Sequence, residues 1–228
     1  MRASDFYKAV KPALDLVVRP LGFRSRDRFY YRIVNDVVQQ FCLLYRNLDF
    51  TLRFDVASVY ADNILAEGHD IYRLINGTNQ WLGLRMVQKA SGELVYEGPV
   101  AADPICPDLR LCADACTDAV KRYLLPFFDE AADSESAHRL LHQRVWDGRS
   151  SDDHTLCVGF LLGMGEWEQA RDALKQYLDR PREEGMFWNE LWKLYDALDS
   201  YDVSCILDYM EKKEVAAYAA LHVKREVP

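Results

Sequence analysis

Five residues near the start of the chain have the types and spacing of an anion-binding surface. They are Arg24, Arg26, Arg28, Tyr30 and Arg32. Guanidinium groups bind phosphates and carboxylates through paired hydrogen bonds, and a tyrosine ring adds a stacking surface. Because alternate side chains of an extended segment point to one side, we expect these five to share an exposed face. The alternative is an ordinary charged outer face of a sheet, which protects a strand from aggregation.

Two histidines in the second half of the chain have the spacing of metal ligands. Glu135, His138 and His142 fall on one side of a predicted helix, and two histidines four residues apart can share a metal ion. However, Arg139 occupies the position at which the zinc-protease motif carries its catalytic glutamate. We therefore interpret these residues as a solvated helix face, and we predict no metal and no cofactor.

The remaining groups that could do chemistry have structural interpretations that we prefer. Residues 152–154, Asp-Asp-His, could supply an acid–base pair, but the same residues suit the start of a helix. Residues 69–70, His-Asp, form a polar pair in a predicted loop. Cys112 and Cys116 lie one helical turn apart, with Cys106 nearby, but a thiolate metal site normally needs four ligands. We expect these cysteines to pack in the core.

The arginine face belongs to a predicted three-stranded antiparallel meander over residues 28–60. In its first strand Phe29, Tyr31 and Ile33 alternate with their neighbours, which is typical of a half-buried strand. We therefore expect these three side chains to be buried, while the arginine and tyrosine side chains between them face solvent.

The other two strands of the meander follow a predicted turn at Asn35–Asp36, two residues that tolerate positive φ. Residues 37–45 are almost wholly apolar, which suits a central strand covered on both faces. In residues 50–56 the alternation returns. Its apolar set should share one buried face packed against a helix, namely Phe50, Leu52, Phe54 and Val56.

Apolar spacing and turn residues predict the elements around the meander. A first helix should end near Val18, closed by residues 19–22, Arg-Pro-Leu-Gly. Residues 64–72 could form a short helix. Residues 81–87 and 94–96 indicate two strands joined as a hairpin.

The chain after residue 107 is predicted to be helical. A long helix over 108–128 should be bent or ended by Pro126. From residue 134 onward we expect only helices, over 135–146, 153–163, 166–179, 186–199 and 203–220. The predicted fold class is α+β, an antiparallel sheet with packed helices followed by an all-helical C-terminal half. The predicted domains are an α+β domain over 1–130 and a helical-hairpin region over 131–228.

The composition is that of a globular protein, since half of the 228 residues are hydrophobic and 28% are charged. The net charge of −8 is uneven: residues 1–60 hold ten Lys/Arg against six Asp/Glu, and the rest hold 18 against 30. This acidic majority argues against nucleic acid and anionic membranes as partners. Because no apolar run could span a bilayer and six cysteines are dispersed, we expect a cytoplasmic protein.

The order of elements over roughly residues 1–130 resembles the bacterial domain of unknown function numbered 4304. The residues that carry the resemblance are Leu21-Gly22-Phe23 at a helix end, Phe29 and Arg32 on a strand, Asp36-Val37-Val38, Tyr45-Arg46, residues 50–59, Arg73, Trp81 and residues 123–128. The resemblance implies an α+β fold and a bacterial accessory or toxin-immunity context. It implies no established activity.

No phosphate-binding glycine loop, serine-nucleophile motif or dinucleotide fingerprint occurs in the sequence. We therefore predict a non-enzymatic protein that binds another protein, for example a basic toxin that an acidic surface attracts through electrostatic steering. The alternative is a small hydrolase or nucleotide-binding enzyme that uses the face from Arg24 to Arg32 to bind an anionic substrate.

Overall fold

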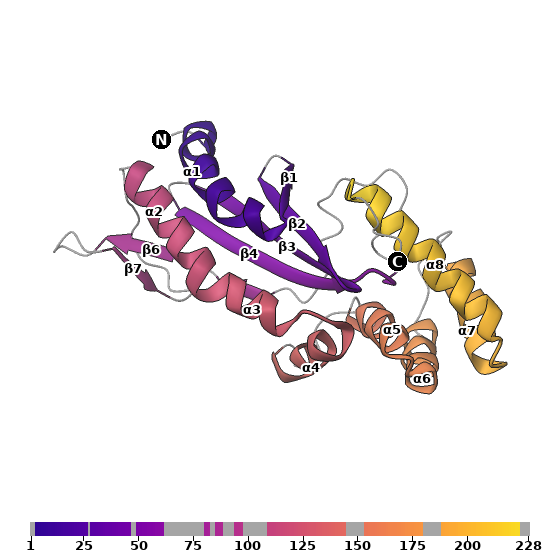
Figure 1. Cartoon of the computed structure of the whole chain (residues 1–228). Helices are drawn as coiled ribbons and strands as arrows, with labels where there is room; N and C mark the ends of the chain where they lie inside the picture. Colours follow the sequence, from indigo (N-terminus) through magenta and orange to yellow (C-terminus); the bar gives the residue numbers. More distant parts are fainter. Residues whose placement is uncertain are drawn as a thin grey trace. The chain divides into compact units, whose positions relative to one another are not determined.

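The computed structural model describes residues 3–26, 28–46, 49–61, 80–82, 85–88, 94–97, 109–144, 153–179 and 188–223. The fold is α+β, as predicted, and the described residues after 131 are helical or in turns (Figure 1). Contacts divide the chain into two units. Unit 1 consists of Met1–Arg32, Gln39–Asp55 and Asn79–Glu130, and unit 2 of Ile33–Val38, Val56–Thr78 and Ala131–Pro228.

Five strands form one sheet in the order β1-β2-β3-β4-β5, which is also their order along the chain. Their bounds are β1 Arg24–Arg26, β2 Phe29–Val34, β3 Val37–Arg46, β4 Asp49–Ser58 and β5 Gln80–Leu82. Arg26 pairs with Phe29 between β1 and β2, and Leu52 pairs with Leu82 between β4 and β5, both in antiparallel register. The predicted meander is therefore present as β2, β3 and β4, with β3 at the centre of the sheet.

A second sheet pairs β6 (Arg85–Gln88) antiparallel with β7 (Leu94–Glu97), as the predicted hairpin requires. The single strand expected over 81–87 is wrong, because β5 pairs with β4 whereas β6 pairs with β7. Because β5 and β6 are almost adjacent in sequence, their residues form one continuous hydrophobic pattern. The sequence therefore does not show that the two strands pair with different partners. The short helix expected at 64–72 lies outside the described residues.

Helix α1 (Ala3–Val18) packs through residues four positions apart, since Phe6, Val10 and Leu14 are all buried. A 3₁₀ turn, η1 (Arg19–Leu21), follows it, and Gly22 then takes the left-handed conformation at φ 86°. Glycine adopts this conformation without a steric penalty, so the predicted helix stop is confirmed.

The core of unit 1 is an aromatic cluster. Tyr30 of β2 stacks on Phe41 of β3 with 4.6 Å between ring centres, and Phe23 meets Phe41 edge-on at 5.5 Å. Phe54 of β4 meets Phe127 edge-on at 4.9 Å. Burial of the predicted inner face of β4 is confirmed for Leu52, Phe54 and Val56, whereas the side chain of Phe50 lies outside the described set.

Helices α2 (Leu109–Ala119) and α3 (Leu125–Glu130) are continuous through a π-helical turn, Val120–Leu124. Figure 1 shows α1 and α2 side by side. Pro126 does not end the helix, which continues to Glu130. In the π turn the Leu125 N–H donates to the Val120 carbonyl, five residues back. This wider turn gives the proline ring space that a regular helix lacks.

In unit 2, helices that follow one another in sequence pack together: α4 (Ser134–Arg144), α5 (Asp153–Met164), α6 (Trp167–Leu178), α7 (Trp188–Asp199) and α8 (Val203–Ala220). These five correspond to the five helices predicted after residue 134. Gly165, at φ 75°, makes the tight turn between α5 and α6. Within the described residues, none of the helices has both the length and the apolar character that crossing a membrane requires.

Within unit 2, α5 lies close to the end of β4 and to the tip of the β2–β3 hairpin. The Ser58 hydroxyl donates to the Gly159 carbonyl at 2.9 Å. Asp36 accepts hydrogen bonds from the backbone N–H and the hydroxyl of Ser134, at the start of α4. A Cβ atom at Gly163 would collide with the side chains of Asp36 and Ser134, so a larger residue there would require these side chains to move. These contacts group the hairpin tip with the helices of unit 2.

Candidate binding groove between the last two helices

Helices α7 and α8 form an antiparallel hairpin because each carries an apolar stripe. Leu194 and Leu198 of α7 and Ile206 and Ala217 of α8 are buried. The connection between the two helices, Ser200–Asp202, is short, which favours antiparallel packing of neighbours.

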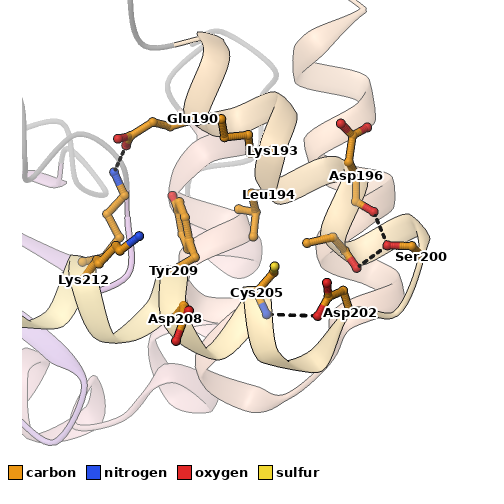
Figure 2. Close-up of a pocket in the computed structure, with 12 residues that line it drawn as sticks. Glu190, Lys193, Leu194, Asp196, Ser200, Asp202, Cys205, Asp208, Tyr209 and Lys212 are labelled. Atoms are coloured by element: carbon orange, nitrogen blue, oxygen red, sulfur yellow. Dashed lines mark hydrogen bonds and ion pairs between the residues drawn. The ribbon is translucent and has the colours of Figure 1, made fainter.

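A groove of about 530 Å³ lies between α7 and α8 (Figure 2), a size typical of ligand sites. Its lining residues recur three or four positions apart, so one face of each helix contributes to it. From α7 and its C-terminal end they are Glu190, Lys193, Leu194, Asp196, Ala197 and Ser200, and from α8 and its N-terminal end Asp202, Cys205, Asp208, Tyr209, Lys212 and Lys213.

One end of the groove contains a buried cation. The Lys213 side chain is only 5% exposed, and its Nζ lies 3.1 Å from a carboxylate oxygen of Glu190. The same Nζ lies 5.1 Å from the centre of the Tyr209 ring, within cation–π range. A buried charge must be paired to be tolerated, and Glu190 supplies the opposite charge for Lys213. Because this pair has no net charge, the net charge of the groove depends on its other residues.

The other end of the groove is built around the start of α8. Asp202 is the N-cap residue, and its carboxylate accepts from the Cys205 N–H at 3.2 Å and from the Ser204 hydroxyl at 2.8 Å. The hydrogen bonds from Ser204 and Cys205 lower the pKa of Asp202 below its usual range. Asp202 is therefore ionised at neutral pH and exposed to solvent.

Cys205 is the one thiol among the described residues that line the groove. Hydrogen bonding to Asp202 and the negative charge of that carboxylate raise the pKa of the Cys205 thiol above its usual range. The thiolate, which is the reactive form, is therefore disfavoured at neutral pH. None of the lining residues is a histidine that could take the thiol proton.

The surface around the groove is acidic. In the described residues from 166 to 214, helices α6 to α8 and their connections carry eleven Asp/Glu, of which ten are exposed, against five Lys/Arg, of which three are exposed. Clustered carboxylates produce a negative potential that attracts basic groups from a distance. We refer to these described residues between 166 and 214 as the acidic surface.

The structure does not bring the predicted arginine face together. Arg24 pairs with Tyr31 and Arg26 pairs with Phe29, so these two arginines share a face with Phe29 and Tyr31. Tyr30 and Arg32 alternate with those two residues on β2 and belong to the opposite face. The prediction treated residues 24–32 as one extended segment, but a tight turn between Arg26 and Phe29 separates β1 from β2. Even-numbered residues of β1 therefore pair with odd-numbered residues of β2, so Arg24 and Arg26 lie on the opposite face from Arg32.

Tyr30 and Arg32 are not free for an anionic ligand. Tyr30 is 1% exposed and its hydroxyl donates to Asp15 of α1 at 3.1 Å. Burial, followed by the charge of Asp15, raises the pKa of Tyr30. The Arg32 guanidinium lies over the Phe23 ring at 4.5 Å and donates to Gln39 at 2.7 Å. The prediction of an exposed face is therefore wrong for both residues.

The remaining arginines of the predicted face lie nearer to solvent. Arg24 and Arg26 are exposed on the short strand β1. Arg28 lies in the turn before β2, half-buried, with its guanidinium 5.5 Å from the centre of the Phe29 ring. Exposure of Arg24 and Arg26 agrees with the prediction, but Tyr30 and Arg32 do not lie on the face that these two arginines share.

The residues of the predicted histidine cluster differ in how exposed they are. Glu135 is exposed, whereas His138 is half-buried with its Nε2 3.3 Å from the Cys157 Sγ. Burial raises the pKa of the Cys157 thiol to about 11, so this thiol is protonated at neutral pH. The side chain of His142 lies outside the described set. In the part of the chain that the structure describes, no group of three or more potential ligands is placed to hold a metal ion.

The other predicted groups fall partly beyond the described residues. Helix α5 begins at Asp153, in agreement with a helix start at residues 152–154, although those side chains are not described. Residues 69–70 and Cys106 lie outside the described part of the chain. Cys116 is fully buried, as expected of a core residue.

The sequence analysis missed the α7–α8 groove, although one signal for it was present. Ile206, Lys213 and Ala217 lie on one stripe of α8 and are all buried, so a lysine interrupts an otherwise apolar series. A lysine at such a position requires a counter-charge on a neighbouring helix. Glu190 meets that need, but only the packing of α7 against α8 identifies it.

The resemblance to the bacterial domain of unknown function rests on the sequence pattern alone and stays a prediction. No protein-family model, no curated protein and no solved structure matches this chain.

Proposed function

We propose that this protein is a non-enzymatic binding protein, and that the acidic surface of α6 to α8 binds a basic segment of a partner protein. The observation that carries the proposal is the excess of eleven carboxylates over five cations in the described residues from 166 to 214. Exposed charges of one sign steer a partner of opposite sign and disfavour partners of the same sign. The acidic surface therefore selects for basic proteins.

The chemistry of the groove supports binding over catalysis. Its thiol, Cys205, has a raised pKa, and its buried lysine is already paired with Glu190. A basic toxin whose cationic face contacts nucleic acid is one partner of the required class, because such a face complements a carboxylate-rich surface. This class also agrees with the toxin-immunity context that the family resemblance implies.

The test uses a fluorescently labelled Lys/Arg-rich peptide of about 20 residues and an Asp/Glu-rich peptide of the same length, both studied by anisotropy. We expect the basic peptide to bind and the acidic peptide not to bind. Affinity should fall as salt rises from about 50 mM to about 300 mM, because salt screens exposed charges.

Two triple variants separate a local surface from net charge. The first removes three carboxylates of the acidic surface: Asp172→Asn, Asp199→Asn and Glu211→Gln. The control removes three exposed carboxylates elsewhere, by Asp5→Asn, Asp114→Asn and Glu130→Gln, with the same change in charge. We expect the first variant to bind the basic peptide with lower affinity than the wild type, and the control to bind it with the affinity of the wild type. Equal weakening in both, or no binding to the wild type, would overturn the proposal.

A further inference from the structure

The α7–α8 groove is elongated. Its lining residues extend from Glu190 to Ser200 along α7 and from Asp202 to Lys213 along α8. At 1.5 Å per helical residue each side is about 15 Å long, or about three helical turns. A helix presents side chains at i, i+4 and i+7 over a similar length. The length of the groove therefore matches one helix lying along it.

Between its polar ends the groove has an apolar floor. Leu194 is 2% exposed and Ala197 is 7% exposed, and Figure 2 shows Leu194, Tyr209 and the sulfur of Cys205 between Glu190 and Asp202. Ala197 and Cys205 have small side chains, which leave space between α7 and α8. This floor suits apolar anchor residues of a docked helix.

The charges of the groove favour basic residues beside those anchors. Because Glu190 neutralises Lys213, the unpaired balance is Asp196, Asp202 and Asp208 against Lys193 and Lys212. Asp202, the N-cap of α8, and Asp208, within α8, are both exposed and lie six residues apart. A helix with lysine or arginine beside its apolar stripe therefore complements this edge of the groove.

We propose that the α7–α8 groove is the docking site for one amphipathic basic helix of the partner protein. Its apolar side chains contact Leu194, Ala197 and Tyr209, and its basic side chains pair with Asp202 and Asp208. This inference rests on the proposed function, since it locates on the acidic surface the place where the partner is recognised.

The apolar part of the proposal is tested with two designed peptides of about 20 residues and equal composition. One carries leucines at helical spacing among lysines, and the other has the same residues scrambled so that no stripe forms. Cys205→Trp fills the groove, whereas Leu207→Trp adds the same side chain to the opposite side of α8, where Leu207 is 52% exposed. Circular dichroism and thermal unfolding establish that each variant is folded.

We expect the striped peptide to bind the wild type more tightly than the scrambled peptide does. Cys205→Trp should weaken the striped peptide by about tenfold or more, while Leu207→Trp should leave it within about twofold. Equal affinities of the two peptides, or equal effects of the two tryptophans, would overturn the groove as the docking site.

The charged part of the proposal is tested with two matched double variants. Asp202→Asn with Asp208→Asn removes two charges from the groove and retains an N-cap, because asparagine caps as well as aspartate. Asp172→Asn with Glu211→Gln removes two exposed charges of the acidic surface outside the groove. We expect the double variant in the groove to lower the affinity for the striped peptide by about tenfold, and the double variant outside the groove to lower it by about twofold.

These variants distinguish failure of the groove from failure of the proposed function. If both pairs weaken the peptide equally, the acidic surface still attracts basic partners, but the groove is not where they dock. If neither the striped nor the scrambled peptide binds the wild type at low salt, the groove and the proposed function are both overturned.

Discussion

Lys213 is a buried charge whose partner, Glu190, is largely in water. Its side chain is 5% exposed, whereas that of Glu190 is 65% exposed. Removal of the lysine and removal of the glutamate should therefore change the stability of the protein by different amounts. Neutralising Glu190 leaves the lysine buried without its counter-charge, which is unfavourable. Removing the lysine leaves only an exposed carboxylate. The pair therefore stabilises the α7–α8 hairpin mainly because it avoids an unpaired buried cation.

This asymmetry gives a prediction about stability. Glu190→Gln should lower the free energy of unfolding by about 1–2 kcal/mol, less than the roughly 3–5 kcal/mol of a fully buried pair, because Glu190 contacts solvent. Lys213→Met removes the buried charge and keeps most of the side-chain length, so it should cost less than about 1 kcal/mol. Urea denaturation of the two variants measures the difference. A greater loss for Lys213→Met than for Glu190→Gln would contradict the account.

Side-chain direction was the least predictable property from the sequence. Alternation identifies a buried face only where the other face meets solvent, and Phe29, Tyr30 and Tyr31 are all buried in succession on β2. The hydroxyl group makes Tyr30 count as polar in a sequence pattern, but in the folded protein this hydroxyl donates a hydrogen bond to Asp15. Such a partner is distant in sequence, so no local pattern indicates it.

At the scale of elements, prediction succeeded where the signal is local. Helices α4 to α8 were predictable because long segments that favour helix lie between clear breaks such as Gly165 and residues 200–202. The division between β5 and β6 was not predictable, because it depends on pairing with β4 and β7. The π-helical turn before Pro126 was also missed, since a regular helix and a π turn have the same apolar pattern over five residues.

Packing between β4 and α3 gives a prediction for Phe54. This residue is 1% exposed and contacts Phe127 and Phe128 of α3. Phe54→Ala should lower the free energy of unfolding by about 3–5 kcal/mol, because it loses buried apolar surface and leaves a cavity. Phe54→Leu, which retains most of the volume, should cost less than about 1.5 kcal/mol. Denaturant melts that show a loss below about 1 kcal/mol for Phe54→Ala would contradict this packing.

Across the whole molecule, the acidic charge belongs to the second half of the chain. Residues 131–228 hold 12 Lys/Arg against 19 Asp/Glu, whereas residues 1–130 hold 16 against 17. The sequence therefore indicated an acidic region, but not the groove within it, because the groove forms only where α7 packs against α8. At physiological salt the field of exposed charges reaches about 8 Å, so steering acts over short range and docking depends on contacts in the groove.

The most direct test of the account reverses one charge of the groove and, separately, the charges of the peptide. Asp208→Lys is titrated by calorimetry with the leucine-striped lysine peptide and with a version in which every lysine is glutamate. We predict that the variant weakens the lysine peptide and strengthens the glutamate peptide, each by about tenfold relative to the wild type. If Asp208→Lys changes both affinities in the same direction, or changes neither, this groove is not where a basic helix binds.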